Sequence, residues 1–139
     1  MAGSRDLVLG IGCDRNTPYA TLAQVIDEAL AQLQASWADV RAVASIDLKA
    51  DEVAMQQLMQ QRGCDIRFYS AAQLAQVPVP NPSETVRKYT GTPSVSEAAA
   101  LLVAGADGQP APMSALLIEK HKLRGPDGRN ATVSVAAIG

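Results

Sequence analysis

The chain has few aromatic residues and few cysteines. The first shortage limits which side chains can form the core, and the second limits which disulfide and metal sites are possible. Only 4% of the 139 residues are aromatic, so the core must be built from Ala, Val, Leu and Ile. The 2 cysteines, Cys13 and Cys64, lie far apart and share no CxxC or Cys/His spacing, which argues against a disulfide framework and a zinc site. We therefore predict a protein of the reducing cytoplasm that holds no metal and no cofactor of its own.

The sequence also lacks an excess of one charge and any long apolar run. With 12 basic and 14 acidic residues the net charge is −2, and no run of like charges supplies the field that nucleic-acid binding needs. The apolar run at residues 7–12 is too short for a signal-peptide core or a membrane span. We expect no binding to nucleic acid and no membrane segment.

Strands and helices alternate in the first half of the sequence. Apolar runs at residues 7–11, 40–46 and 65–69 predict buried strands. An amphipathic helix begins at Thr17 as N-cap with Pro18 in its first turn, and a second helix begins at residue 51 and ends at Gly63. Strands that alternate with helices pair in parallel through right-handed crossovers, so this half predicts a layered α/β domain.

The second half has a different pattern. A proline-rich loop at residues 77–83 precedes a short helix that Gly91 ends, and Ser94 with Glu97 forms a capping box that opens another helix. Strands at residues 115–118 and 132–138, joined by a long polar loop with a GPDG turn, predict a closing hairpin. We interpret the polar segment near residues 106–113 as a surface loop, so residues 1–139 form a single domain.

The glycine-rich segment at residues 10–18 follows the first strand, where ligands of open α/β sheets bind. Its glycines allow close approach of backbone to a ligand, and Arg15, Asn16 and Thr17 can donate hydrogen bonds to an anion. Arg15 stands where a dinucleotide fold needs its third glycine, and no GxxxxGK[ST] motif is present, so neither NAD nor a P-loop nucleotide is expected. The alternative is that the glycines serve only a tight turn.

Cys13 lies at the same corner, beside the start of a helix. The helix dipole favours a thiolate, so Cys13 is a candidate nucleophile with a lowered pKa; the alternative is a small buried or ligand-lining thiol. His121 is the only histidine, and the sequence does not bring it near Cys13. Asp47 and Lys49 follow the second strand and should face the same edge, either to bind a ligand carboxylate or to form a local ion pair.

Two further groups have both a functional and a structural interpretation. The capping box of Ser94 and Glu97 is more often structural than functional. Basic residues gather in the predicted hairpin loop, where they either clamp an anion or form a solvated loop; they are Lys120, His121, Lys122, Arg124 and Arg129.

Taken as a set, the segments GIGCDRNT, SIDLKADE, PSETVRKYTGTPSVSEAAALL, EKHK and TVSVAAI are more specific than any one residue. In order and spacing they resemble the C-terminal domain family of the cobalamin-biosynthesis protein CbiG and its stand-alone counterpart CobE, over about residues 7–138. The resemblance implies a three-layer α/β/α domain with a mixed, mainly parallel sheet of about five strands. Because no CbiG-like domain precedes the match, the stand-alone CobE type of the aerobic route is expected. Asp14 departs from the family, which often has a basic residue there.

The resemblance implies a protein of cobalamin (vitamin B12) biosynthesis that binds or handles a carboxylate-rich precorrin or corrinoid intermediate. CbiG-type proteins open a precorrin lactone and release a two-carbon aldehyde. The alternatives are therefore a hydrolase or lyase in which Glu97, Asp47 or Cys13 is base or nucleophile, and a non-catalytic module that docks on other pathway enzymes. Carboxylate arms need distributed donors, and the matched candidates for ligand binding are Gly12, Cys13, Arg15, Thr17, Asp47, Lys49, Gly91, Ser94, Glu97 and Lys120.

Overall fold

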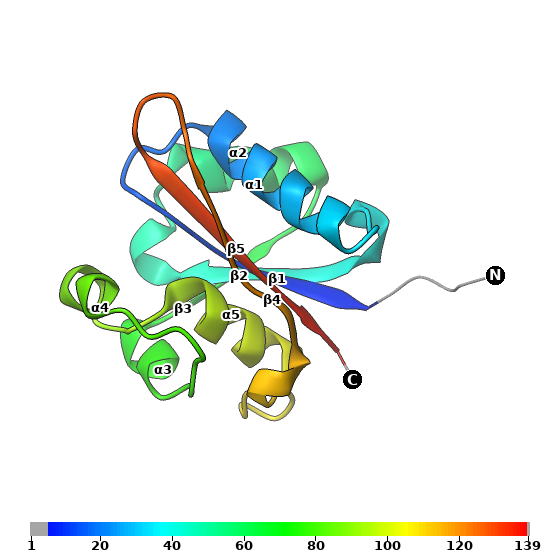
Figure 1. The fold of residues 1–139 in the computed structure, drawn as a ribbon, viewed down its shortest axis with the longest axis vertical. Helices are drawn as coiled ribbons and strands as arrows, with labels where there is room; N and C mark the ends of the chain where they lie inside the picture. Colours follow the sequence, from blue (N-terminus) through cyan, green and yellow to red (C-terminus); the bar gives the residue numbers. More distant parts are fainter. Residues whose placement is uncertain (1–5, 139) are drawn as a thin grey trace.

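The computed structural model describes residues 6–138 and contains one five-stranded sheet between two helical layers (Figure 1). The strands are β1 (Leu7–Cys13), β2 (Val40–Ile46), β3 (Ile66–Tyr69), β4 (Leu116–Arg124) and β5 (Asn130–Ala137), in the order β3-β2-β1-β5-β4. β1, β2 and β3 pair in parallel, whereas β5 is antiparallel to both β1 and β4. The expected three-layer fold with a mixed sheet and a C-terminal hairpin is confirmed.

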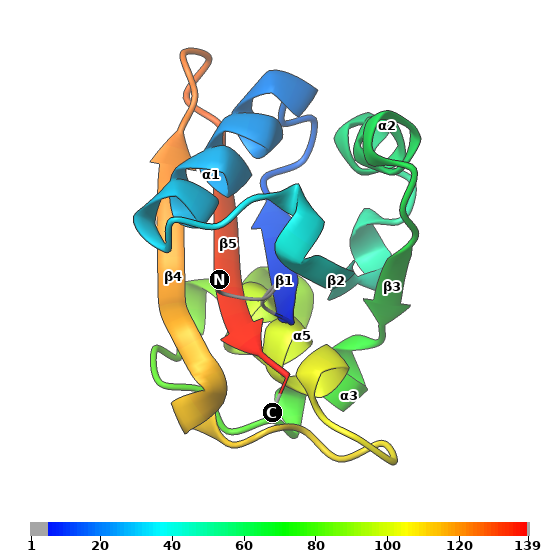
Figure 2. The same ribbon diagram turned by 90° about the vertical axis from the view of Figure 1, so that its right-hand side faces the viewer.

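Helices cover both faces of the sheet, as Figures 1 and 2 show. One layer contains α1 (Tyr19–Gln32) and α2 (Val53–Arg62), and the other contains α3 (Ala71–Ala75), α4 (Glu84–Thr90) and α5 (Val95–Ala104). None of the helices in residues 6–138 is long and apolar enough to cross a bilayer.

Alternate residues of β1 pack against the two layers. Leu9 and Ile11 belong to the core with α1 and α2, while Val8 packs with Ala100 of α5. Gly10 lies directly under α5, since a Cβ atom there would be 1.9 Å from the carbonyl oxygen of Ser96. The alanine-rich face of α5 and this glycine therefore let the helix approach the sheet closely, as an aromatic-poor sequence requires.

The hairpin differs from the sequence prediction. β4 continues through Lys120, His121 and Lys122 to Arg124, and Arg124 pairs with Asn130, so the predicted long polar loop is wrong. β4 is an edge strand with alternating exposure, and such a strand accommodates polar residues on its solvent side. Most of the basic residues assigned to the loop are strand residues.

Two predicted helix caps are also wrong. The N-cap of α1 is Pro18, and the hydroxyl of Thr17 donates instead to the carbonyl oxygen of Asp14, 2.7 Å away. Ser94 is the N-cap of α5 but makes no side-chain capping bond, and the other half of the predicted box is missing too, since Glu97 accepts a hydrogen bond from Asn81. Reciprocal capping boxes occur elsewhere, at Ser36 with Asp39 and at Ser70 with Gln73, where the sequence did not lead us to expect them.

Candidate functional site

The carboxyl ends of β1, β2 and β3 lie at one end of the sheet, which we call the carboxyl edge. The turn η2 (Asp47–Lys49), the first turn of α5 and the tip of the β4–β5 hairpin lie at the same end (Figure 1). Most predicted binding residues come from these segments; they are Gly12, Cys13, Arg15, Thr17, Asp47, Lys49 and Ser94. Gly91, with φ 84°, ends α4 and leads into Ser94.

The buried carboxylate of Glu52 organises the loop between β1 and α1. Its Oε1 accepts a hydrogen bond from the backbone N–H of Asn16 at 3.0 Å, and its Oε2 lies 2.6 Å from the guanidinium of Arg15. The same guanidinium donates to Asp51 at 3.0 Å and holds the pKa of that carboxyl below its ordinary value. The donors predicted for an anion at Arg15 and Asn16 are thus bound to acidic residues of the chain itself.

The hairpin tip completes the corner. The hydroxyl of Thr17 lies 3.3 Å from the carbonyl oxygen of Asn130. Asp14 Oδ2 accepts hydrogen bonds from the backbone N–H of Asn130 at 2.8 Å and from its side-chain amide at 3.1 Å. Asp14, the residue that departs from the family pattern, therefore fixes the hairpin to the loop, which a basic residue would not do.

The thiol of Cys13 is partly buried at this corner. Burial raises its pKa from an ordinary 9.0 to about 11, with the negative charge of Glu52 adding to the rise and the positive charge of Lys49 opposing it. The expected lowering of the pKa is wrong, because α1 begins only at Tyr19 and the effect of its dipole is confined to its first turn. Cys13 is protonated at neutral pH and is poorly suited to act as a nucleophile.

A labelling experiment checks the state of Cys13. Replacing Cys64 with serine leaves Cys13 as the only cysteine, and a pKa of about 11 instead of 9.0 lowers its thiolate fraction. Because alkylation needs the thiolate, we expect iodoacetamide at pH 8 to react about 100-fold more slowly with Cys13 than with an ordinary thiol. Reaction at the rate of the same variant after denaturation in urea would contradict the raised pKa.

Asp47 and Lys49 differ in what surrounds them. The charge of Lys49 acts on Cys13, so the end of β2 does reach the corner of β1 as predicted. Asp47 is exposed, and within residues 6–138 it forms no ion pair with Lys49 or any other cation. The ion pair between Asp47 and Lys49, one of the two alternatives considered from the sequence, is therefore absent from residues 6–138.

A second group of polar side chains, which we call the polar cluster, lies on the α5 face and consists of Asn81, Ser94, Glu97, Glu119 and Lys120. Glu97 is 0% exposed, and its Oε2 accepts a hydrogen bond from the side-chain amide of Asn81 at 2.6 Å. The same amide donates to Glu119 at 3.0 Å, and the ammonium of Lys120 is 3.5 Å from the carbonyl oxygen of Asn81. Glu97 Oε1 and the hydroxyl of Ser94, also 0% exposed, have no partner in the described structure.

The polar cluster shows what the sequence missed. Asn81 lies in the proline-rich loop and bonds to residues 16 and 38 positions away, so no local pattern indicates its role. Glu52 was likewise assigned only to a helix start. A hollow of about 970 Å³ lies at the other end of the sheet, and none of the predicted binding residues lines it.

Comparison with known proteins agrees with the fold. The sequence model of the family described as cobalamin synthesis G C-terminus matches residues 7–136. Over 132 residues the chain is 39% identical to cobalt-precorrin-5A hydrolase of Priestia megaterium, which covers 95% of this chain and 32% of that protein. It is 42% identical over 101 residues to Protein CobE of Sinorhizobium sp, covering 71% of this chain and 66% of that one.

The crystal structure of CobE, a protein from the cobalamin (vitamin B12) biosynthetic pathway, superimposes with a TM-score of 0.78 and 32% identity, covering 96% of this chain and 90% of that one. The chain thus spans about a third of the hydrolase and about two thirds of the curated CobE relative. These matches confirm the resemblance that the motifs indicated. The chain belongs to the cobalamin synthesis G C-terminus family and is a protein of cobalamin biosynthesis.

Proposed function

We propose that the domain binds a carboxylate-bearing corrinoid precursor at the carboxyl edge and passes it on within the pathway. Three buried side-chain polar atoms of the described residues accept or donate no hydrogen bond: Oε2 of Glu52, the hydroxyl of Ser94 and Oε1 of Glu97. Oε2 of Glu52 still has an ion pair with Arg15, so the observation that carries the proposal is the pair of atoms left without either kind of contact, at Ser94 and Glu97. Burying a polar atom without a hydrogen bond costs about 1–3 kcal/mol. The presence of two such atoms at the start of one helix therefore points to a bonding partner outside the chain. The free thiols of Cys13 and Cys64 suit a cytoplasmic site of action.

The proposed ligand has to displace contacts within the chain. Asn81 is exposed and covers Glu97, so movement of the proline-rich loop opens the polar cluster. Ser94 and Lys120 then donate to carboxylates of the ligand, while Glu97 accepts from a hydroxyl group. At the corner, a carboxylate that displaces the exposed Asp51 reaches Arg15, and Lys49 adds a second positive charge.

Two corrinoids test the proposal. Cobyrinic acid has arms that end in free carboxylates, whereas the arms of cobinamide are amidated. Because charged hydrogen bonds are about twice as strong as neutral ones, we expect cobyrinic acid to bind at least about tenfold more tightly in absorbance titrations at fixed ionic strength. Equal affinity for the two compounds, or no binding of cobyrinic acid below millimolar concentration, would refute the proposal.

Two serine variants locate the binding site. Ser94 has a buried hydroxyl without a partner, and Ser45 has a buried hydroxyl that donates to the carbonyl oxygen of Ile11 at 2.7 Å. Ser94→Ala is expected to weaken cobyrinic acid binding by about threefold to tenfold without loss of stability. Ser45→Ala is expected to lower the free energy of unfolding by about 1 kcal/mol without affecting binding; the opposite pattern would place the ligand elsewhere.

Lactone hydrolysis is the second candidate function, favoured by the 39% identity to cobalt-precorrin-5A hydrolase. Glu97 would take a proton from water, the resulting hydroxide would add to the lactone carbonyl carbon, and the ring C–O bond would break with the proton passing to its oxygen. Glu97→Gln keeps the size of the side chain and removes the base, so hydrolysis should stop while binding persists. Undiminished hydrolysis by this variant would exclude Glu97 as the base.

A further inference from the structure

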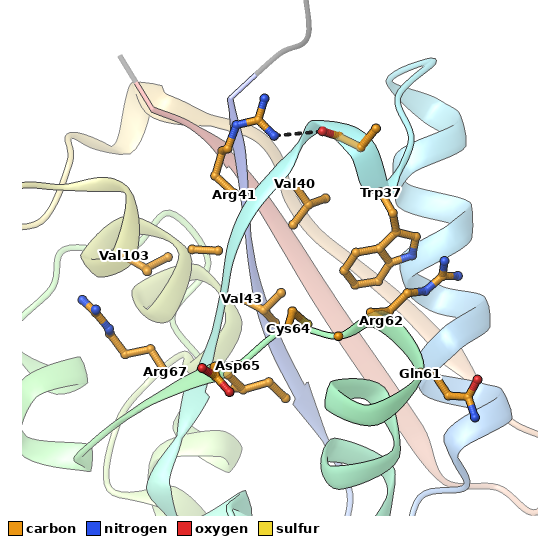
Figure 3. A pocket seen from close by; sticks show the side chains of 14 residues that line it. Trp37, Val40, Arg41, Val43, Gln61, Arg62, Cys64, Asp65, Arg67 and Val103 are labelled. Carbon is orange, nitrogen blue, oxygen red and sulfur yellow. Dashed lines mark hydrogen bonds between the residues drawn. The ribbon is translucent and has the colours of Figure 1, made fainter.

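The hollow of about 970 Å³ lies beside the amino ends of β2 and β3, away from the carboxyl edge (Figure 3). We call it the arginine pocket, since three of its lining residues are Arg41, Arg62 and Arg67. Figure 3 shows Trp37 and Arg62 on the side of α2, and Arg67 and Val103 on the side of α5. The pocket therefore wraps around the outer edge of the sheet.

Unequal strand lengths create this pocket. β2 has seven residues and β3 has four, and their pairing begins only at Val43 with Ile66. In the described part of the chain no strand covers Val40, Arg41 or Ala42 on that side, so this stretch of β2 is an uncovered edge; the backbone N–H of Val40 bonds to the carbonyl oxygen of Trp37. Uncovered strand edges present N–H groups that bind extended or anionic partners.

Positive charge predominates among the lining side chains. Among the described residues that line the pocket, Asp65 is the one acidic residue beside the three arginines. Arg67 has no ion pair within residues 6–138, whereas Arg41 pairs with Asp6 at 2.8 Å. Exposed ion pairs of this kind contribute little to stability, so a carboxylate ligand can take the place of Asp6.

Arg62 and Trp37 form the remaining wall. The guanidinium of Arg62 stacks over the indole ring at 4.8 Å and lies 4.0 Å from a carboxylate oxygen of Asp27. Stacking holds the planar guanidinium in place and leaves its edge available for paired hydrogen bonds to a carboxylate. The volume of the pocket lies within the range of small-molecule sites, about 300–1,000 Å³.

We propose that the arginine pocket binds a small molecule that carries several carboxylate groups. Separate carboxylates contact Arg41, Arg62 and Arg67, and the uncovered edge of β2 supplies further donors. This site is distinct from the carboxyl edge and does not depend on the proposed function.

Trp37 reports directly on the pocket because it is the only tryptophan of the chain. The probe is butane-1,2,3,4-tetracarboxylate, which is colourless, titrated at constant ionic strength because salt screens such contacts. We expect a saturable change in tryptophan fluorescence that sodium chloride does not produce. The proposal would be overturned if fluorescence changed linearly with tetracarboxylate concentration, or if sodium chloride produced the same change as the tetracarboxylate.

Two matched variants assign the effect to the pocket. Arg67→Met removes a guanidinium that no carboxylate of residues 6–138 pairs with, so the fold should persist, and we expect affinity to fall at least about fivefold. Arg87→Met removes the same charge from α4, outside the pocket, and should change affinity less than about twofold. Equal effects of both variants would show general charge attraction and refute the site. The titration contains no corrinoid, so its failure leaves the proposed function standing, and failed cobyrinic acid binding leaves this site standing.

Discussion

Replacing Gly10 with alanine is expected to lower the free energy of unfolding by about 3 kcal/mol or more, and in practice to prevent stable folding. The added Cβ atom would lie 1.9 Å from the carbonyl oxygen of Ser96 and 2.6 Å from the backbone nitrogen of Ala100. Both contacts are with the backbone of α5, which cannot turn aside as a side chain can. The helix must therefore move away from β1 as a whole, and it would take Ser94 and Glu97 with it. Urea unfolding followed by circular dichroism measures the loss.

Gly12 gives the matched control two residues along the same strand face. A Cβ atom there would lie 3.6 Å from Cγ1 of Val95, an ordinary contact. Gly12→Ala should therefore change the free energy of unfolding by less than about 1 kcal/mol. If both variants lost the same stability, close approach of α5 would not be the reason that Gly10 is a glycine.

The parallel part of the sheet was predictable because its signals are local. The apolar runs predicted the bounds of β2 to the residue and those of β1 apart from its last two residues, and Gly63 predicted the end of α2. The length of the hairpin was mispredicted because His121 and its neighbours are polar and therefore resemble a loop. Whether residues of an edge strand are buried depends on which helix covers them, and the local sequence does not show this. His121 contacts Glu28 of α1 at 2.7 Å, a contact between residues 93 positions apart that no window of sequence contains.

The candidate site was only partly predictable for the same reason. The motifs located the carboxyl edge, but Glu52 and Asn81 bind their partners across 36 and 16 positions of sequence. The pKa of Cys13 was predicted with the wrong sign, because the sequence shows a nearby helix but does not show how deeply the thiol is buried. Which donors remain free for a ligand depends on such long-range contacts.

Replacing Glu97 with methionine is expected to weaken ligand binding strongly without loss of stability. Glu97 is 0% exposed and Oε1 has no partner, so the wild-type chain bears the cost of an unsatisfied buried oxygen. Methionine has a similar length and no such oxygen, and Asn81 is exposed and keeps its bond to Glu119. The free energy of unfolding should stay unchanged or rise by about 1 kcal/mol, while cobyrinic acid binding falls at least about tenfold.

Glu52→Met is the control, because Glu52 is 3% exposed but each of its carboxylate oxygens has a contact. Oε1 accepts a hydrogen bond from the backbone N–H of Asn16, and Oε2, which has no hydrogen-bond partner, forms an ion pair with Arg15. Here the substitution leaves the backbone N–H of Asn16 without its acceptor and removes the buried carboxylate partner of Arg15, which keeps only its exposed contact with Asp51 and its bond to the carbonyl oxygen of Leu48. It should therefore lower the free energy of unfolding by about 2–4 kcal/mol. A large loss of stability in Glu97→Met as well would show that Glu97 is a structural residue like Glu52. The buried polar cluster would then be explained by the fold alone, and the argument that Glu97 awaits a ligand would fail.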